Sequence, residues 1–264
     1  MRPRVLCMLF VFALIGSSVS ASDYLYEQEI VDEIVASRPA GEIVWLKAGD
    51  RPFLGLYLEA TTKTSHGAIL ILHGISGHPD SSNIIRPLRI RLSTFGWSTL
   101  AIQMPVLRTN KISADSYSLI PEAQERIRAA LDFLKKNKIE NLVLIGHGFG
   151  STAALSFQFE KQDDDIKALV VIGLPVIEKD PLTPAILDRF SQLDLPMLDI
   201  YGSVDMPQVL KTADRRAQVV RKNLVYRQVE IDGADHYFRY ANDALVKTIY
   251  GWIKRVAPGV EITK

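Results

Sequence analysis

Continuous apolar runs dominate the chain from residue 67 onward, and amphipathic stretches of helical length separate them. Runs without alternation of polar and apolar positions indicate strands that are buried on both faces of a parallel sheet. Helical stretches between such strands indicate crossover connections, so the pattern predicts an α/β fold with helices on both faces of the sheet. The predicted strands lie at residues 68–72, 98–102, 142–145, 167–172, 197–201 and 224–231.

A different pattern precedes this part of the chain. Apolar and polar residues alternate at 43–47 and 53–59, and the turn-like sequence Ala48-Gly49-Asp50-Arg51-Pro52 separates the two segments. The alternation predicts a two-stranded hairpin with one solvent-facing side, which suits the antiparallel edge of a mixed sheet. Residues 23–37 carry apolar side chains at approximately helical spacing, and they are interpreted either as a short helix packed on the domain edge or as a frayed arm.

The helical periodicity predicts crossover helices and one insertion. The crossover helices are expected at residues 84–95, 121–136, 151–158, 208–222 and 242–256. A small helical insert is expected within residues 173–195, with a pocket beneath it. The longest irregular stretches, 103–120 and 173–181, leave the carboxyl ends of predicted strands, where α/β sheets bind ligands, so we expect them to form walls of the site.

Composition and charge limit the classes of function. The chain has 264 residues, of which 47% are apolar and 23% charged, and this balance is typical of a soluble globular protein with one large core. The formal net charge of +1 provides no overall field that would attract nucleic acid, so no nucleic-acid partner is expected. The basic residues between Lys211 and Lys222 are interpreted as a solvated helix face.

The first 21 residues have the features of a signal peptide. Two arginines precede an apolar segment at residues 6–15, and the small residues Val19-Ser20-Ala21 follow it. Cleavage after Ala21 would leave a single domain of residues 22–264 in the periplasm or outside the cell, without firm insertion into a membrane. An uncleaved anchor is the alternative, although the apolar segment is shorter than the ~20 residues that span a bilayer.

Cysteine usage adds a chemical limit. The chain has one cysteine, Cys7, and it lies within the signal segment. After cleavage the domain would have no cysteine, which excludes disulfides, a cysteine nucleophile and thiolate ligands for zinc.

The sequence Gly146-His147-Gly148-Phe149-Gly150 follows one of the apolar runs and precedes a helical stretch that is rich in small residues. A strand, a sharp glycine turn and a helix are the context of the nucleophile elbow G-x-S-x-G, whose central residue projects its side chain above the sheet. Position 148 is glycine, so the chain has the scaffold of an acyl-transfer site without the oxygen that would attack a substrate. We expect Phe149 and His147 beside this turn, with His147 either facing the pocket or packed away from it.

Further residues lie where such a site requires them, in the chain order nucleophile, acid, histidine. Asp205 follows the strand at 197–201, which is the usual position of the acid that orients the histidine. His236 follows the last strand, where a general base would reach the turn at Gly148. The sequence His73-Gly74-Ile75-Ser76 follows the first parallel strand, where a backbone N–H commonly contributes to an oxyanion hole. We therefore expect His236 and Asp205 to form a retained pair.

These motifs resemble the α/β-hydrolase superfamily, and more narrowly an uncharacterised bacterial family of exported α/β-hydrolase-like proteins. The resemblance covers nearly all of residues 22–264. The segments that carry it include Phe53-Leu54-Gly55-Leu56-Tyr57-Leu58-Glu59-Ala60, His73-Gly74 with Gly77-His78-Pro79-Asp80, Pro87-Leu88-Arg89, Gly96-Trp97, Gln103-Met104-Pro105 and Gly146-His147-Gly148. The resemblance implies the α/β-hydrolase fold, with a mostly parallel sheet and an antiparallel N-terminal hairpin. Broader relatives are esterases, lipases and peptidases, which need a nucleophile that position 148 lacks.

The residues leave three hypotheses for function open. A binding protein would hold a small-molecule ligand in the pocket or dock a protein partner. A weak hydrolase would use water, activated by His236 with Asp205 as its partner, in the space of the missing serine side chain. A metal site built from Asp205 and the histidines is the third, although their spacing matches no known metal motif.

Individual residues also have alternative roles. Ser151 and Ser76 could each serve as nucleophile, but neither has the forward-projecting geometry of the elbow. Asp205 could instead be the N-cap of the helix at 208–222. No cofactor and no metal are expected, and the favoured prediction is an exported protein that is inactive as a serine esterase.

Overall fold

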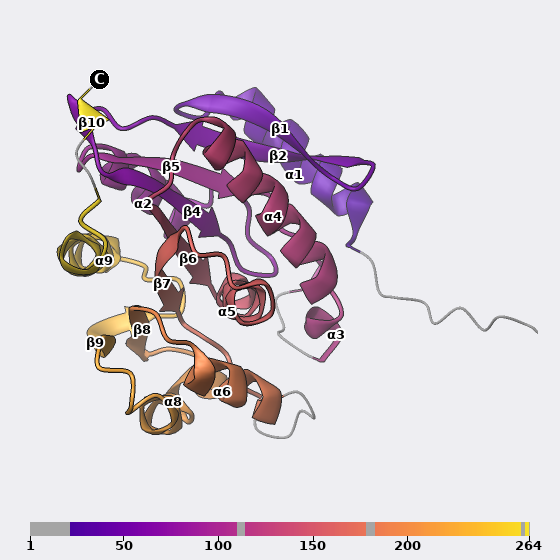
Figure 1. Cartoon of the computed structure of the whole chain (residues 1–264). Coiled ribbons are helices and arrows are strands. Elements are labelled where there is room, and N and C mark those ends of the chain that lie inside the picture. Colours follow the sequence, from indigo (N-terminus) through magenta and orange to yellow (C-terminus); the bar gives the residue numbers. More distant parts are fainter. Residues whose placement is uncertain (1–21, 110–113, 178–182, 260–261, 264) are drawn as a thin grey trace, which may run out of the picture.

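An eight-stranded sheet forms the centre of the protein, and helices cover both of its faces (Figure 1). The computed structural model describes residues 22–109, 114–177, 183–259 and 262–263. In spatial order the strands are β1 (Glu42–Ala48), β2 (Arg51–Leu58), β5 (Trp97–Ile102), β4 (Gly67–Leu72), β6 (Leu142–His147), β7 (Ile166–Ile172), β8 (Met197–Val204) and β9 (Tyr226–Asp235). β1 pairs with β2 and β2 with β5 in antiparallel fashion, and the other neighbouring strands are parallel. The predicted sheet, mostly parallel with an antiparallel N-terminal hairpin, is confirmed.

Helices follow the strands as crossover connections, and a short strand pair lies apart from the main sheet. The helices are α1 (Tyr24–Ser37), α2 (Ile85–Ser93), α3 (Ala114–Tyr117), α4 (Ile120–Lys136), α5 (Phe149–Lys161), α6 (Thr183–Gln192), α7 (Pro207–Leu210), α8 (Ala213–Val219) and α9 (Asn242–Val256). The separate pair consists of β3 (Thr64–Ser65) and β10 (Ile262–Thr263), which are antiparallel. No sequence pattern predicted this pair.

Alternate residues of the central strands face two separate cores. In β4, Leu70 and Leu72 pack with side chains of α4 and α5, whereas Ile69 and Ile71 pack with side chains of α2 and α9. Figure 1 shows these two pairs of helices on opposite faces of the sheet. A strand that is covered on both faces needs an apolar side chain at every position, which explains the continuous runs in the sequence.

α1 covers the face of the hairpin that α4 leaves open. Its Asp23 cap accepts a backbone N–H of the first turn, and Ile30 and Ile34 pack against Leu54 and Leu56 of β2. Because these side chains are buried together, residues 24–37 form a helix packed on the domain edge. The alternative interpretation as a frayed arm is wrong.

The helix predicted at residues 208–222 is instead two short helices, α7 and α8. The break occurs because the carbonyl of Val209 accepts hydrogen bonds from the Arg216 guanidinium at 2.8 Å and from the Thr212 hydroxyl at 3.3 Å. Arg216 is drawn inward by a buried ion pair with Asp199 of β8, with Nε and Oδ2 2.8 Å apart. Buried polar groups must be paired, so this contact competes with helix continuation. The following strand also begins later than predicted, at Tyr226.

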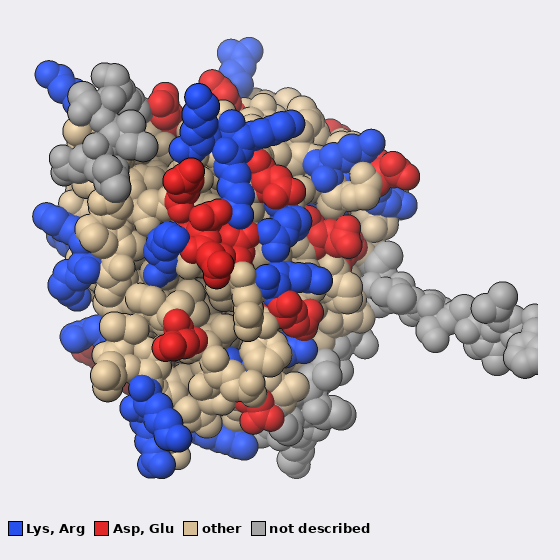
Figure 2. Space-filling model, viewed as in Figure 1, with Lys and Arg blue, Asp and Glu red and all other residues tan. Residues whose placement is uncertain are grey.

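The signal segment, residues 1–21, lies outside the described residues. Within residues 22–109, 114–177, 183–259 and 262–263, no helix combines the length and the apolar character needed to cross a membrane. Acidic and basic side chains are interspersed on the face shown in Figure 2. On α4, for example, Arg128 and Lys135 both pair with Asp163, at 2.6 and 3.0 Å.

Candidate functional site

The turn between β6 and α5 has the backbone of a nucleophile elbow. β6 ends at His147, α5 begins at Phe149, and Gly148 between them has φ 54° and ψ −116°. The Gly148 N–H donates to the carbonyl of Ile172 in β7 at 2.9 Å, which fixes the turn to the neighbouring strand. Residues with a side chain rarely adopt a positive φ because the Cβ then crowds the backbone. The strained turn is therefore present although position 148 has no side chain.

The flanking glycines permit close approach of the strand and the helix. A Cβ on Gly146 would overlap the carbonyl of Gly150, and a Cβ on Gly150 would overlap the carbonyl of Leu72 in β4. Backbone atoms cannot move aside as a flexible side chain can. The first turn of α5 therefore lies directly against β4 and β6, which places its N-terminus at the carboxyl edge of the sheet.

His236 and Asp205 form a buried pair at this edge. His236 Nδ1 and Asp205 Oδ1 are 2.6 Å apart, and the two residues are only 6% and 5% exposed. Asp205 also accepts the N–H of Met206 at 2.7 Å and that of Gly202 at 3.3 Å. The helix after β8 has Met206 at its N-cap and no side-chain cap hydrogen bond, so the N-cap interpretation of Asp205 is wrong.

The other nitrogen of the His236 ring faces the turn at Gly148. A Cβ placed on Gly148 would lie 3.3 Å from His236 Nε2 and 3.8 Å from the Cα of Gly74. The structure thus places the acid, the histidine, the apex of the turn and the loop after β4 in the spatial order of a serine-hydrolase site. Gly148 is the residue at the apex of this turn.

Gly173, at the end of β7, is a site residue that the sequence analysis did not single out. It has φ 55°, and a Cβ there would lie 2.9 Å from His236 Nδ1 and 3.3 Å from Asp205 Oδ2. Any side chain at this position would collide with the His236 ring in its present place. The sequence signal was weak, because a glycine after a strand is common in any turn.

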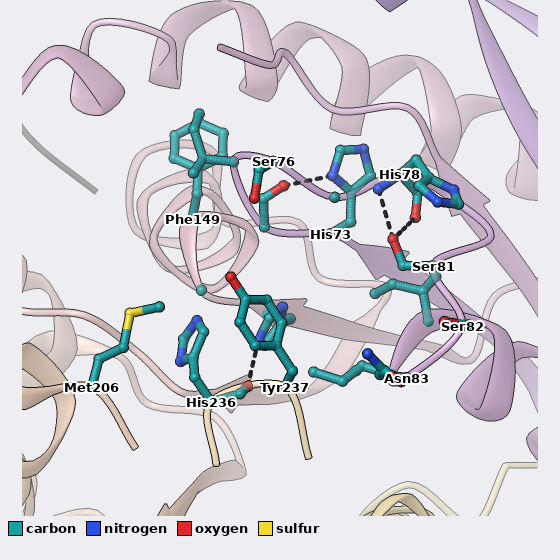
Figure 3. Close-up of a pocket in the computed structure, with 17 residues that line it drawn as sticks. His73, Ser76, His78, Ser81, Ser82, Asn83, Phe149, Met206, His236 and Tyr237 are labelled. Carbon is teal, nitrogen blue, oxygen red and sulfur yellow. Dashed lines mark hydrogen bonds between the residues drawn. The ribbon is translucent and has the colours of Figure 1, made fainter. Parts of the chain in front are cut away.

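A cavity of about 260 Å³ opens above the turn. All predicted site residues except Asp205 line it, namely His73, Gly74, Ile75, Ser76, His147, Gly148, Phe149 and His236. Asp205 lies behind the His236 ring and outside the lining. Figure 3 shows Met206, His236 and Tyr237 along one side of the cavity, across from Ser76 and the loop that follows it.

Comparison with protein-family models identifies the chain's relatives. The model described as "Protein of unknown function (DUF3530)" matches residues 26–124 and 121–255, which together exceed half of the chain. The protein belongs to the DUF3530 family. A comparison with curated protein sequences finds no match.

Solved structures show that the DUF3530 chain has the α/β-hydrolase fold. Est1E from Butyrivibrio proteoclasticus matches with a TM-score of 0.65 and 14% identity, covering 81% of this chain and 98% of that one. XC6422 from Xanthomonas campestris, described as a serine hydrolase without lid, matches with a TM-score of 0.65 and 15% identity, covering 84% of this chain and 98% of that one. The esterase Pf2001 from Pyrococcus furiosus matches with a TM-score of 0.67 and 15% identity, covering 85% of this chain and 93% of that one. At these identities the likeness concerns the fold alone.

In this DUF3530 protein His147 supports His236 from behind. Its Nε2 donates to the carbonyl of His236 at 3.0 Å, and the two ring centroids are 4.6 Å apart. Burial, together with the proximity of His236, lowers the pKa of His147 to about 3, so the ring is neutral near pH 7. His147 thus packs against His236 and also lines the cavity, so the structure combines the two alternatives expected from the sequence.

His73 holds the loop after β4 in place. Its Nδ1 donates to the carbonyl of Gly74 at 2.7 Å, and its Nε2 accepts the N–H of Met104 at 2.9 Å. Burial lowers the pKa of His73 to about 3, so this ring is also neutral. Because both nitrogens are engaged, His73 has no lone pair to offer a metal. The part of the chain that the structure describes holds no group of three His, Cys, Asp or Glu residues suited to a metal ion.

The two alternative serines lie apart from the apex. Ser151 is fully buried, and its hydroxyl donates to Gly146 and accepts the N–H of Ile172 at 3.0 Å, so it connects β6 to β7. Ser76 lies on the cavity wall across from His236 (Figure 3). Neither hydroxyl has a hydrogen bond to His236.

The cavity is not beneath the insert, contrary to the expectation from the sequence. No described residue of the predicted walls, 103–120 and 173–181, or of the 173–195 insert lines it. α6 instead buries Leu187 and Phe190 in the core shared with α5. The wall across from His236 comes from residues 73–85, because the loop between β4 and α2 crosses the carboxyl edge of the sheet.

A buried ion pair fixes this wall. Asp80 binds Arg89 of α2 at 2.7 Å and Arg86 at 2.8 Å, and the Arg89 side chain is fully buried. Arg89 also donates to the carbonyl of Ala40 at 2.6 Å. Asp80 and Arg89 belong to the segments quoted for the family resemblance, but the resemblance alone did not reveal that they pair.

Tyr237 lines the cavity and was also missed from the sequence. It adjoins His236 in the sequence and could have been included on that ground.

Proposed function

We propose that this protein is an exported, α/β-hydrolase-like binding protein that does not act as a serine esterase. Its cavity would hold a small-molecule ligand or a segment of a partner. The observation that carries this proposal is the position of His236, whose Nε2 lies 3.3 Å from the place of a Cβ on Gly148. The base of a catalytic triad is directed at a residue that has no atom to activate.

The contacts of the other hydroxyl groups support this proposal. An acyl-enzyme requires an oxygen within hydrogen-bond reach of the base, about 2.6–3.2 Å. Ser151 hydrogen-bonds backbone groups of β6 and β7 instead, and Ser76 has no hydrogen bond to the His236 ring. The cavity has both polar and apolar lining groups, which suit the binding of a ligand. The fold alone does not assign a reaction to it.

Export is part of the proposal and is supported by the sequence of residues 1–21, with its basic start, apolar middle and small-residue end. Fractionation of bacteria that produce the full chain should recover it outside the cytoplasm. The N-terminal sequence of that material should begin at Ser22. Recovery of an uncleaved chain in the membrane fraction would support the anchor instead.

A pair of substitutions at position 148 tests the lack of a nucleophile. The parent protein should remain unlabelled by a fluorophosphonate probe, and Gly148→Ala should behave in the same way. Gly148→Ser should gain labelling and hydrolysis of short esters, on the order of 10²-fold above Gly148→Ala, because its hydroxyl would meet His236 Nε2. Both variants place a Cβ at a positive φ and should lose a similar stability of about 1–2 kcal/mol.

Labelling of the parent protein would contradict the proposal, as would ester turnover by the parent at a rate comparable to that of Gly148→Ser. The Gly148→Ala variant controls for the added Cβ. Its 3.3 Å approach to the imidazole requires the ring to move by a few tenths of an ångström in both variants alike.

A second candidate function is slow hydrolysis by activated water. The observation in its favour is the 2.6 Å contact with Asp205, which orients the His236 ring as in a general base. In related triads, binding and the oxyanion hole retain roughly 10³-fold catalysis over water without the nucleophile. Steady ester turnover without a burst, abolished in His236→Gln and unaffected by fluorophosphonate, would favour this function over binding alone.

A further inference from the structure

The first turn of α5 offers hydrogen-bond donors at the floor of the cavity. α5 is 13 residues long, and its N-cap is Gly148. The first N–H groups of a helix have no partner within the helix, and the helix dipole adds partial positive charge at this end. Phe149, the first helical residue, lines the cavity, so this helix end faces the space above Gly148.

His236 points a polar atom at the same place. The residue is 6% exposed, its Nδ1 is taken by Asp205, and no described residue is hydrogen-bonded to its Nε2. Nε2 faces the apex of the turn from one side, and the helix N-terminus faces it from below. Two independent features of the fold therefore converge on one point in the cavity.

The protonation of His236 decides what can bind there. A neutral ring that donates Nδ1–H to Asp205 presents a lone pair at Nε2, which repels an anionic oxygen. A protonated ring presents an N–H and attracts one. Among the groups that face this ring, His147 is neutral because burial lowers its pKa to about 3, and Tyr237 packs against it edge-on at 5.3 Å. Asp205 is then the remaining charged group in contact with the ring. Its negative charge repels a dianionic ligand more strongly than a monoanionic one.

We infer, on the basis of the proposed binding function, that the ligand is a small monocarboxylate which binds together with one proton. One carboxylate oxygen accepts from the N-terminus of α5 and the other from His236 Nε2–H. The proton comes from solvent and forms the Nε2–H bond of His236, and no other covalent bond changes. The apolar part of the ligand lies against Ile75, Ile84 and Met206 of the cavity wall.

Titration calorimetry with acetate, butyrate and benzoate between pH 5.5 and 8.5 tests this inference. In two buffers with different ionisation enthalpies, binding should take up about one proton per ligand at the alkaline end, and the affinity should fall about tenfold per pH unit there. His236→Gln should lose the proton uptake. Arg239→Gln, which removes an exposed charge paired with Asp235, should keep it and serves as the matched control.

The outcomes separate this inference from the proposed function. Binding of methyl esters or of inorganic phosphate in preference to carboxylates would overturn the carboxylate inference and leave the binding function standing. Carboxylate binding that does not depend on pH would overturn the proton coupling. Labelling of the parent protein by fluorophosphonate would overturn the proposed function itself.

A separate cluster surrounds Ser22, the residue that would follow the predicted cleavage. Ser22 is 5% exposed, and its backbone nitrogen lies 3.4 Å from Glu122 Oε2. Its hydroxyl donates to Glu27 Oε2 at 3.0 Å and accepts the N–H of Val106 at 2.9 Å. Glu27 and Glu122 share one cation, Arg126, so the two carboxylates exceed the guanidinium by one negative charge.

We propose that cleavage supplies the missing positive charge. Hydrolysis of the Ala21–Ser22 peptide bond consumes one water and leaves a carboxylate on Ala21 and an ammonium group on Ser22. The ammonium group lies within reach of Glu122, and it balances the charge of the cluster that joins α1 to α4. Removal of the signal segment thereby stabilises the remaining domain. Tyr24, whose hydroxyl is 3.4 Å from Glu122 Oε2, is the other titratable group in contact with this carboxylate. The Arg51 guanidinium lies 3.9 Å from the centroid of the Tyr24 ring and forms no ion pair with Glu27 or Glu122.

Two chains that differ by one residue test this proposal. A chain that begins at Ser22 should have an unfolding constant about fivefold lower at pH 6 than one that begins at Ala21, whose Ser22 nitrogen is an amide. The partner raises the ammonium pKa in the folded state, so the difference is complete below about pH 7.7, the ordinary value, and is lost at higher pH.

Glu122→Gln should remove the difference between the two chains, and acetylation of Ser22 should do the same without changing a side chain. Equal stability of the Ser22 and Ala21 chains at pH 6 would overturn the proposal. A natural N-terminus at another residue would overturn it as well.

Discussion

Gly148 keeps φ 54° and ψ −116° even though glycine has access to many other conformations. Its neighbours impose this geometry: its N–H is bound to β7, and Gly146 and Gly150 hold the strand and the helix in close contact. The elbow is therefore a property of the packing around residue 148 and does not depend on a catalytic side chain. For this reason we expect a serine introduced there to have the orientation of a nucleophile.

His73 and His147 are residues whose charge state is set by burial. Both have a pKa of about 3 in the folded protein, against about 6.5 in an unfolded chain. Between these values the unfolded chain binds more protons than the folded one, so stability falls as the pH decreases below 6.5. The slope is on the order of 1.4 kcal/mol per pH unit for each histidine. Urea unfolding between pH 4.5 and 7.5 measures it.

His147→Gln is the control for this pH dependence. Glutamine retains a donor for the carbonyl of His236 but does not titrate, so the slope should decrease by about one proton. An unchanged slope in this variant would show that His147 is not the group responsible. At pH 7.5 the variant and the parent both lack a charge at this position, so that pH gives the effect of the altered packing alone.

At the scale of elements, the junction of β6 and α5 depends on backbone contact. Gly146→Ala would bring a Cβ onto the carbonyl of Gly150, and we expect a loss of about 3 kcal/mol or more in the free energy of unfolding. Gly251→Ala is the matched control, because a Cβ there meets nothing within 4 Å and lies in the helix α9. It should stabilise the protein by about 1 kcal/mol. Chemical denaturation of both variants decides the matter, and equal stabilities would refute the close-approach argument.

Sequence periodicity predicted most helices and strands because each of them depends on a local pattern of apolar residues. The strand at 98–102 and the helix at 242–256 follow from local runs of apolar residues, and both are present, the helix with the predicted ends. The break at Thr212 followed from Arg216, which reaches the carboxylate of Asp199 in a distant strand. An interaction between residues far apart in the sequence leaves no periodic trace, so the break could not be predicted.

At the scale of the whole molecule, α1 joins the N-terminal residues to the same folding unit as the sheet. Ile34 is 3% exposed and packs on β2, whereas Val35 beside it is 43% exposed. Ile34→Ala should lower the free energy of global unfolding by about 2–5 kcal/mol, and Val35→Ala by less than about 0.5 kcal/mol. Far-ultraviolet dichroism and tryptophan fluorescence should report one transition. If Ile34→Ala left that transition unchanged, α1 would be an independent unit.

The sequence by itself determined the order of strands and helices and the presence of glycine at position 148, because local periodicity and residue identity do not depend on distant contacts. It also placed His236 and Asp205 after the strands where a hydrolase carries its base and acid. Only the tertiary structure decided that the two are 2.6 Å apart and directed at Gly148, that the loop at 73–85 forms the wall, and that Gly173 leaves room for the ring. These features arise where several strands end side by side, and a one-dimensional pattern contains no measure of that distance.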